Sequence, residues 1–414
     1  MAADQVIAGI DIGTTKICVL VGKITQNGRI QIVGPGVVPA YGLSKGVVTD
    51  IQQATDSIRE AIRKAEHVSG YTIHEAYVSI GGAHIGSENR DGQAAIGRAD
   101  RPITREDLER ALELAGTFPS MPHNRTLLHS IPREYTLDEQ RNIKNPLGML
   151  GYRLEVEAHI VTCSNTAKQN IKKCVEECQV HPLEIVLQPL ASCESVLTDD
   201  ERKQGVALLD IGGGTTDLAI VLGGGFWETK VFPVGGNHIS NDIAWALHVP
   251  FPAAEDAKVR YGHAVADEVV DEAAIELPVF GGDGRQRFTR RQICQLVEER
   301  VEEMLGMVNR HIRDVGVDRF LAAGVVLTGG CADLSGIRTV AERVFDMPVR
   351  LGSPQSMVGR FESLSSPKFA TAVGLLEWGR KKQQSTPSGN LEPDPDADGG
   401  ILAWLRSTLG RLAP

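Results

Sequence analysis

The chain has 414 residues, 42% of them hydrophobic, which is enough for two or more domains with buried cores. Its formal net charge of −10 disfavours general nucleic-acid binding, because such binding depends on neutralising phosphates with cationic side chains. No apolar run approaches the length that spans a bilayer, and a strand is predicted almost at once, at Val6, so we expect neither a spanning helix nor a signal peptide.

The first predicted element is a hairpin at residues 9–22, GIDIGTTKICVLVG. Its first strand is apolar and ends at Asp11, and a turn with little side-chain bulk follows. Glycine lets backbone N–H groups approach an anion and threonine hydroxyls add donors, so this turn is predicted to bind phosphate. The residues assigned to this role are Gly13, Thr14, Thr15 and Lys16.

Strands and amphipathic helices alternate through the rest of the first lobe, which indicates an α/β fold. Its predicted elements are strands at 30–38 and 75–82, a helix over 50–70 with Asp50 as N-cap and Gly70 at its end, a helix over 165–179 and a strand over 182–192. Gln188 lies towards the end of this last strand, where a neutral amide can orient an attacking water, although a purely structural glutamine is an equally good interpretation.

Residues 84–162 interrupt this pattern with many polar turns. They contain one predicted helix, 104–116, and one predicted strand, 154–163. We interpret this segment as an inserted subdomain.

A second glycine-rich hairpin, LLDIGGGTTDLAIV at 208–221, repeats the design of the first, with Asp210 in the place of Asp11. A single hairpin of this kind is often an ordinary tight turn, but two copies favour two similar lobes that share a phosphate-binding cleft. Two carboxylates facing a polyphosphate suit a hydrated Mg²⁺, which Asp11 and Asp210 would hold through water. The residues assigned to phosphate in the second turn are Gly212, Gly213, Gly214, Thr215 and Thr216.

Further elements of the second lobe can complete a nucleotide site. Gly329 and Gly330 follow an apolar strand and precede a helix expected to start near Asp333, so an adenosine could lie against their backbone. Glu255 and Lys258 share one face of a predicted helix over 249–264 and could hold ribose and purine. The alternatives are an ordinary strand-to-helix turn and a solvated ion pair. Two more helices are predicted, over 290–312 and 368–379.

The C-terminal region reads as a tether followed by an amphipathic helix. Residues 380–400 are rich in Pro, Gly, Ser and Asp without an apolar pattern, which is typical of a flexible linker. In the helix expected over 401–414, arginines flank an apolar face, a pattern that suits an anionic membrane interface; docking on a protein surface is the alternative. The residues assigned to membrane binding are Ile401, Leu402, Trp404, Leu405, Arg406, Leu409, Arg411 and Leu412.

The cysteines and histidines predict no metal site. The seven cysteines are scattered, and the pair Cys174 and Cys178 has no second pair to complete a zinc site. The eleven histidines form no cluster with ligand spacing. Reduced thiols are expected, as in the cytoplasm.

These motifs, in this order, resemble those of the actin-like ATPase superfamily, and within it the FtsA family of bacterial cell-division proteins. The supporting stretches are GIDIGTTKICVLVG, YVSIGGAHI, LLDIGGGTTDLAI, FPVGGNHISNDIA, AEDAKVRYG and VVLTGGCADLSGI, and the resemblance covers about residues 6–379 and the C-terminal tip. It implies an actin-like α/β fold with two lobes around a nucleotide cleft. The implied parts are a first-lobe core (1–83, 163–204 and 356–379), an insert (84–162), a second-lobe core (205–244 and 311–355), a further subdomain (245–310), a linker (380–400) and a membrane-targeting helix (401–414).

The resemblance also implies a function. It supports binding of ATP and Mg²⁺ more strongly than ATP turnover. It implies self-association into filaments on the cytoplasmic face of the inner membrane at the septum, anchoring of the tubulin-like protein FtsZ through its C-terminal tail, docked at about 245–310, and recruitment of later division proteins. An actin-like adaptor of a pilus or cell-shape system and a sugar kinase of the same fold remain the alternatives, and a chaperone is the least favoured.

Overall fold

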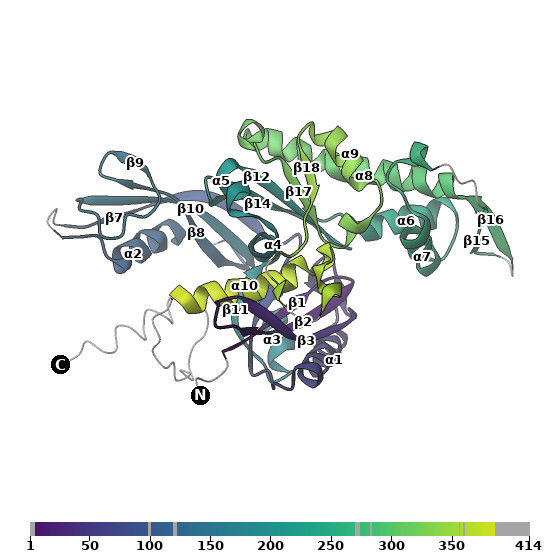
Figure 1. The fold of residues 1–414 in the computed structure, drawn as a ribbon, viewed down its shortest axis with the longest axis horizontal. Helices are drawn as coiled ribbons and strands as arrows, with labels where there is room; N and C mark the ends of the chain where they lie inside the picture. The colour runs from purple at the N-terminus through teal and green to yellow at the C-terminus, as the bar shows by residue number, and fades with distance from the viewer. Residues whose placement is uncertain are drawn as a thin grey trace. The chain divides into compact units, whose positions relative to one another are not determined.

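The computed structural model describes residues 5–97, 101–118, 122–269, 274–281, 284–355, 357–358 and 361–385. The chain divides into two compact units, residues 1–380 and 381–414, and the architecture below is that of the first (Figure 1). Within the described ranges, no helix combines the length and apolarity needed to cross a membrane.

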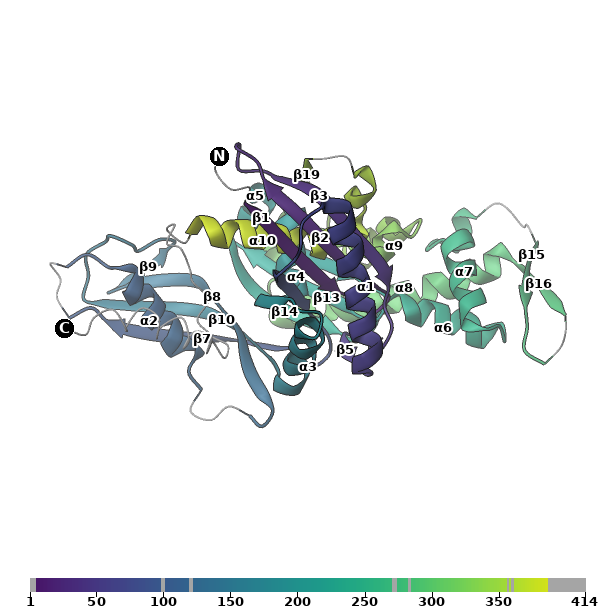
Figure 2. The ribbon, with the colours of Figure 1, turned by 90° about the horizontal axis from the view of Figure 1, so that it is seen from below.

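A six-stranded mixed sheet forms the core of the first lobe, in the order β11-β6-β1-β2-β3-β19. Its apolar side chains alternate between two helical layers, with α1 and α3 on one face and α10 on the other; Figure 2 shows α1 beside the strands. The strands are β1 Val6–Ile12, β2 Lys16–Ile24, β3 Ile30–Pro39, β6 Glu75–Ile80, β11 His181–Leu187 and β19 Met357–Val358, and the helices are α1 Ile51–Ser69, α3 Asn165–Glu176 and α10 Ala370–Ser385.

Helix α1 confirms the predicted caps. The Gln53 amide donates to Oδ1 of Asp50 over 3.0 Å, and Gly70, at φ 74°, ends the helix in the left-handed region. The helix lies directly on β3, because a Cβ on Gly36 would come within 2.0 Å of the Ala61 carbonyl oxygen. The backbones of α1 and β3 can approach this closely because Gly36 has no side chain.

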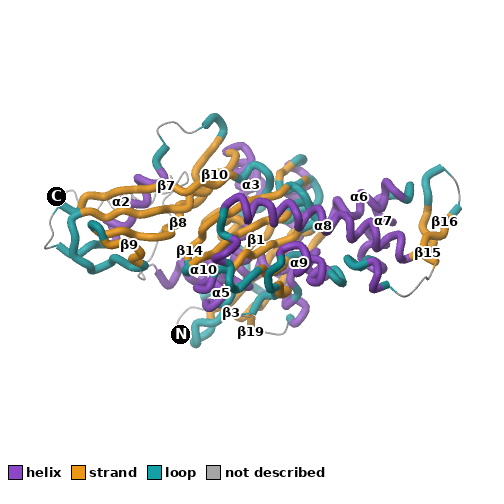
Figure 3. The backbone as a smooth tube through the Cα atoms, turned by 90° about the horizontal axis from the view of Figure 1, so that it is seen from above, coloured by secondary structure: helices purple, strands orange, loops and turns teal. Residues whose placement is uncertain are grey.

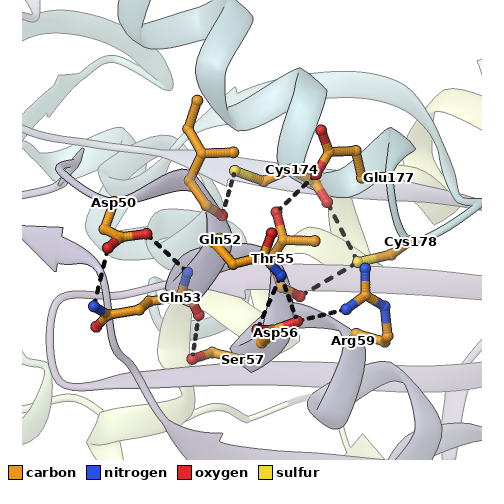
Figure 4. A network of polar contacts seen from close by, with 11 residues as sticks. Asp50, Gln52, Gln53, Thr55, Asp56, Ser57, Arg59, Cys174, Glu177 and Cys178 are labelled. Carbon is orange, nitrogen blue, oxygen red and sulfur yellow. Dashed lines mark hydrogen bonds and ion pairs between the residues drawn. The ribbon is translucent and has the colours of Figure 1, made fainter.

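Two cysteines join α1 to α3 as structural donors (Figure 4). The Cys174 thiol donates to the Ile51 carbonyl over 3.8 Å, and the Cys178 thiol donates to the Thr55 carbonyl over 3.5 Å. The Thr55 hydroxyl donates to Glu177 in the same network. All seven cysteines are free, as predicted.

The second lobe contains a five-stranded sheet in the order β14-β13-β12-β17-β18. Helices α6, α8 and α9 cover one face of it, and α4 packs against the other. The strands are β12 Val206–Ile211, β13 Thr216–Leu222, β14 Gly225–Phe232, β17 Val325–Thr328 and β18 Val349–Leu351, and the helices are α4 Gln188–Val196, α5 Asp199–Gln204, α6 Gly236–Ala246, α7 Phe251–Tyr261, α8 Arg290–Val315 and α9 Ile337–Phe345.

Smaller elements complete the two lobes. A two-stranded hairpin accompanies α7 and α8, another two-stranded sheet precedes α1, and short 3₁₀ turns connect the rest. These elements are β15 Ala274–Pro278 with β16 Arg285–Thr289, β4 Leu43–Ser44 with β5 Val47–Val48, η1 Ala266–Glu268, η2 Asp318–Phe320, η3 Gly330–Asp333, η4 Glu362–Ser365 and η5 Pro367–Phe369.

Between β6 and α3 the chain forms a separate four-stranded antiparallel sheet, β7-β10-β8-β9, with helix α2 packed on it (Figure 3). Thr104 begins α2 through a capping box with Asp107, as the predicted helix boundary requires. The elements are β7 Gly86–Ala95, α2 Arg105–Gly116, β8 Arg125–Leu137, β9 Gln140–Ile143 and β10 Arg153–Ser164. This inserted sheet packs on β14 of the second lobe, where the Ser87 hydroxyl donates to the Thr229 carbonyl over 2.7 Å.

Three predicted boundaries were wrong by more than three residues. The strand predicted to run to residue 192 ends at Leu187, because Pro189 starts helix α4 with its preset φ. The last helix does not end at Gly379 but continues to Ser385, so the first residues of the predicted linker are helical. Gly379 is a packing glycine, since a Cβ there would lie 2.5 Å from the Tyr77 ring.

The third wrong boundary is the start of α9. Residues Gly330–Asp333 form a 3₁₀ turn, and the α-helix begins only at Ile337, after Gly336 at φ 79°. Both residues predicted to bind adenosine here, Gly329 and Gly330, still lie directly after β17.

Candidate functional site

The first hairpin closes tightly around its turn. Strands β1 and β2 pair in register, with Asp11 opposite Cys18, and the Gly13 amide donates to the Lys16 carbonyl over 3.1 Å. A Cβ on Gly13 would lie 2.8 Å from that same carbonyl oxygen, so the turn requires glycine. The turn places the backbone of Thr14 and Thr15 at the end of the sheet.

The second hairpin repeats this geometry. Strands β12 and β13 pair in register, and the Gly212 amide donates to the Thr215 carbonyl over 2.9 Å. The missing side chains let the two turns touch, because a Cβ on Gly213 would lie 2.2 Å from Cγ2 of Thr15, and one on Gly214 would lie 2.8 Å from Oγ1 of Thr14. The predicted meeting of the two hairpins is thus present in the fold.

A small cavity of about 80 Å³ lies between the two turns. Common ligand pockets have roughly 300–1,000 Å³, so a nucleotide would require the turns to separate further. The cavity collects thirteen of the sixteen cleft residues singled out in the sequence: Asp11, Gly13, Thr14, Thr15, Lys16, Gln188, Asp210, Gly212, Gly213, Gly214, Thr215, Gly329 and Gly330.

A larger groove, of about 810 Å³, lies elsewhere, between β3, the C-terminal half of α1 and the 3₁₀ turns after β19. Its lining mixes apolar residues such as Val37 and Leu364 with charged residues of α1, and it contains none of the predicted site residues. We therefore assign the candidate site by its chemistry and not by cavity size.

The carboxylate of Asp11 is buried at the end of β1. Its Oδ1 accepts a hydrogen bond from the Ser79 hydroxyl over 2.9 Å. Burial raises the pKa of Asp11, although the positive charge of Lys16 and the Ser79 hydroxyl oppose the shift. A cation bound in the cavity would therefore stabilise the ionised form of the Asp11 carboxylate.

Asp210 is held from the other side of the cleft. Its Oδ2 accepts from Ser192 over 2.6 Å and from Thr371 over 3.0 Å, which leaves Oδ1 directed elsewhere. A Cβ on Gly329 would lie 2.4 Å from this Oδ1, so the glycine makes room for the carboxylate. Burial raises the pKa of Asp210 as well.

Asp217, a third buried carboxylate in the cavity wall, was not singled out in the sequence. Its Oδ2 accepts from the Thr215 hydroxyl over 2.9 Å, whereas its Oδ1 has no hydrogen-bond partner. Burial raises the pKa of Asp217 to about 8, and the charge of Asp210 adds to the shift. A buried polar atom without a partner calls for an explanation, such as a bound water or ligand.

Lys16 and Gln188 line the cavity but are engaged with protein atoms. The Lys16 ammonium donates to the Lys368 carbonyl over 2.6 Å. The Gln188 amide donates to the Ile12 carbonyl over 3.3 Å and more weakly to Ser79, and its Oε1 lies against Gly81. Gln188 is thus a fixed amide at the start of α4 rather than a free one at the end of a strand.

The structure does not bring three predicted residues into the cavity wall. The Thr216 hydroxyl donates to the Val234 carbonyl over 2.8 Å, inside the second lobe. Glu255 and Lys258 form an ion pair of 2.7 Å on α7, and Lys258 also donates to the Gly236 carbonyl over 3.0 Å. Gly236 itself donates to Gly212, so the pair lies behind the second turn, next to the cavity.

Sequence reasoning also missed several contributors. Gly46 and Lys368 line the cavity from loops that carry no recognisable motif, as does Thr371 at the start of α10. Asp217 could have been noticed, because it lies directly opposite Asp210 in the β12–β13 hairpin and follows the same turn. Ser79 and Ser192 have no signal in the sequence, since their role depends on which strand and helix meet.

The donor set suits a polyanion with a hydrated cation. Two glycine turns, the Thr14 hydroxyl and the Lys16 ammonium supply positive dipoles and charge, and the buried carboxylates face them. Among the described residues, no three or more His, Cys, Asp or Glu side chains are arranged to ligate a metal directly.

Comparison with known proteins gives the family. Residues 207–374 match the family model for the cell division protein FtsA, and residues 82–162 match the model for the SHS2 domain inserted in FtsA. FtsA of Pseudomonas aeruginosa is 42% identical over 379 residues, covering 92% of this chain and 90% of that protein. FtsA of Escherichia coli K12 is 36% identical over 97% of this chain and 96% of its own length, and FtsA of Bacillus subtilis is 36% identical over 91% and 84%.

Solved structures with low sequence identity share the fold. The PilM–PilN type IV pilus biogenesis complex aligns with a TM-score of 0.64 at 16% identity, covering 90% of this chain and 98% of that chain. MreB5 of Spiroplasma citri, solved with ADP bound, aligns with a TM-score of 0.56 at 14% identity, covering 92% and 99%. The fold is therefore actin-like, as predicted, and the chain belongs to the FtsA family of cell division proteins.

Proposed function

We propose that the protein binds ATP with Mg²⁺ between its two hairpins, forms filaments on the cytoplasmic face of the inner membrane at the septum, and anchors the FtsZ ring there while recruiting later division proteins. One observation carries the proposal: two phosphate-type turns face one cavity in a chain of the FtsA family. Family membership argues against the sugar-kinase and pilus-adaptor alternatives.

The residues of the cleft fit the proposed ligand. Asp11 and Asp210 would hold the hydrated Mg²⁺, and the Lys16 ammonium would neutralise phosphate charge. The other phosphate contacts would come from Gly13, Thr14, Thr15, Gly212, Gly213, Gly214, Thr215 and Thr216, and the adenosine contacts from Glu255, Lys258, Gly329 and Gly330. Thr216 would contribute its backbone rather than its hydroxyl, which Val234 already engages.

ATP binding is proposed more firmly than ATP turnover. A water-orienting amide must be free to meet its water, whereas the amide nitrogen of Gln188 is committed to Ile12 and Ser79. We expect slow hydrolysis, which suits a protein whose nucleotide state persists within a filament.

The proposed membrane anchor, residues 401–414, lies outside the described residues, and so does most of the linker. The support for it is the sequence: six apolar residues on one helical face, flanked by Arg406 and Arg411. One short helix would bind reversibly, and a filament that displays many copies would bind firmly through avidity.

A co-sedimentation assay with anionic liposomes and ATP tests the anchor. We expect the full chain to pellet with the vesicles and a chain ending at Gly400 to stay in the supernatant. Leu405→Glu should release the full chain, whereas the matched change Ser407→Glu, on the opposite face, should not. Equal pelleting of all four proteins would remove the membrane function from the proposal.

The proposed FtsZ-docking region, residues 245–310, exposes large apolar side chains. Trp245 is 83% exposed, Val259 71% and Phe280 69%, and we propose that these side chains contact the FtsZ tail. Binding of a fluorescent FtsZ tail peptide should weaken in Trp245→Ala but not in Phe320→Ala, an exposed aromatic outside this region. Loss of binding on deleting 84–162 with 245–310 intact would contradict the assignment.

A further inference from the structure

The β4–β5 turn forms a strap beside the candidate site. We call residues 43–48 the strap: β4 and β5 pair as Leu43 with Val48 and Ser44 with Val47. Leu43 and Val48 pack against the core of the first lobe, so the base of the strap is anchored. The tip is exposed at Lys45 and lines the cavity at Gly46.

The tip of the strap touches both lobes through glycines. On the second-lobe side, a Cβ on Gly214 would lie 3.2 Å from the Cα of Lys45. On the first-lobe side, a Cβ on Gly46 would lie 2.7 Å from the Gly81 carbonyl oxygen, and one on Gly82 would lie 2.8 Å from the Lys45 carbonyl oxygen. The tip therefore fills the space between the second phosphate-type turn and the Gly81–Gly82 turn.

The strap also orients a side chain of the cavity. The Gly46 amide donates to Oγ1 of Thr14 over 3.2 Å. A hydroxyl that accepts here must direct its own proton elsewhere, and Thr14 faces the cavity, so its proton is available to an anionic ligand there. Moving the strap would change this hydroxyl from an oriented donor to a rotating one.

The base of the strap is held more firmly than its tip. Its base is held by strand pairing and by core contacts, whereas van der Waals contact is what joins its tip to Gly214. Since the cavity of about 80 Å³ is too small for a nucleotide, some part of its wall must move before a nucleotide can enter or leave. Among the described residues, no hydrogen bond joins the strap tip to Gly214, so this part of the wall can move away from the opposite lobe without breaking one.

We propose that the strap is the gate for nucleotide exchange, and that Gly46 positions Thr14 when the gate is shut. The proposal rests on the proposed binding of ATP. A gate lowers or raises the barrier for entry and exit alike, so loosening it should raise the association and dissociation rates together and leave the equilibrium constant almost unchanged. A residue that only contacts the ligand would change the dissociation rate and the affinity together.

Stopped-flow exchange of a fluorescent ATP analogue with Mg²⁺ on the full chain tests the gate. Gly46→Ala should push the tip away from Gly81 and raise both rates at least about fivefold, with a weaker Kd because the Thr14 hydroxyl is no longer oriented. Val48→Ala, which weakens the base of the strap and lies outside the cavity wall, should raise both rates with less than about a twofold change in Kd. Gly70→Ala is the matched control, because Gly70 has the same left-handed φ with open space around it.

The outcomes separate the two proposals. If the wild-type chain does not bind the analogue, both the nucleotide site and the gate are wrong. If it binds, but both strap variants exchange at the wild-type rate or change affinity through dissociation alone, the site stands and the gate is wrong. Hydrogen exchange of the strap amides should also slow when the analogue is saturating, and unchanged exchange would contradict the shut state.

Discussion

Chain segments attached to the first lobe meet the second lobe in two very different ways. The inserted sheet meets β14 through a buried polar network in which His159, fully buried, shares hydrogen bonds of 2.8 Å with both Asn89 and Thr229. Beside it the Arg133 guanidinium stacks 3.5 Å from the centre of the Trp227 ring. This junction uses directional contacts that are lost as soon as the partners separate.

The hairpin turns meet with almost no directional contact. Thr14 and Thr15 lie against Gly214 and Gly213, and among the described residues no hydrogen bond joins one turn to the other. The fixed link at the cleft is deeper, where the Thr371 hydroxyl of α10 donates to Oδ2 of Asp210 over 3.0 Å. Because glycine contacts cost little to open, we expect the cleft to widen while the insert stays with the second lobe.

The largest expected loss of stability comes from a change at the junction between the inserted sheet and β14. His159→Ala should lower the free energy of unfolding by about 3 kcal/mol, because it leaves a cavity and strands the polar groups of Asn89 and Thr229. Urea unfolding of the full chain measures the change, with the exposed His181→Ala as control. A loss below about 1 kcal/mol would mean that the junction does not hold the insert.

The same histidine makes the free energy of unfolding depend on pH. Burial lowers the pKa of His159 to about 4. Between pH 6.5 and 4 the unfolded chain therefore binds more protons than the folded chain, and the free energy of unfolding falls as the pH falls. His159→Gln should remove this part of the acid sensitivity, which denaturant titrations at pH 7 and pH 5 would detect.

Asp217 in the cleft should make the free energy of unfolding depend on pH in the opposite direction. With the pKa of Asp217 raised to about 8, the folded chain binds more protons than the unfolded chain between pH 4 and pH 8, so this group destabilises the fold as the pH rises. Asp217→Asn should therefore stabilise the protein, and by more at pH 8 than at pH 5. Equal stabilisation at both pH values would show that Asp217 is not the titrating group.

The smallest expected effect on stability is at the contact between the turns. A Cβ on Gly213 overlaps Thr15, yet Gly213→Ala should cost less than about 1 kcal/mol if the cleft can open to relieve the clash. The matched change Gly374→Ala, where a Cβ would lie 1.8 Å from the Ala191 carbonyl in a closed helix contact, should cost several times more in the same unfolding assay. Equal costs would mean that the cleft is as rigid as the core.

The comparison also explains what the sequence could predict. The hairpins are local, and glycine, threonine and aspartate at fixed spacing carry their geometry, so Asp11, Asp210 and the predicted turn residues other than Thr216 do line one cavity. The caps of α1, Asp50 and Gly70, were equally local. The family resemblance added the global fold, which no local pattern contains.

The missed features depend on long-range packing. His159 lies in an ordinary alternating strand, and its role appears once β10 is brought next to β14. Gly379 looks like a helix terminator but serves the contact with Tyr77, which is distant in the sequence. Helical spacing allowed Glu255 and Lys258 either a place in the site or an ion pair with each other, and it could not show that their helix lies behind the turn, where the structure has the ion pair.

The most direct test of the central claim is equilibrium binding of ATP by the full chain, measured by calorimetry with and without Mg²⁺. The account predicts one ATP per chain, binding weakened by removal of Mg²⁺, and a loss of at least about tenfold in affinity for both Asp11→Asn and Asp210→Asn, one from each hairpin. Unchanged affinity in either variant would show that the two hairpins do not form one site.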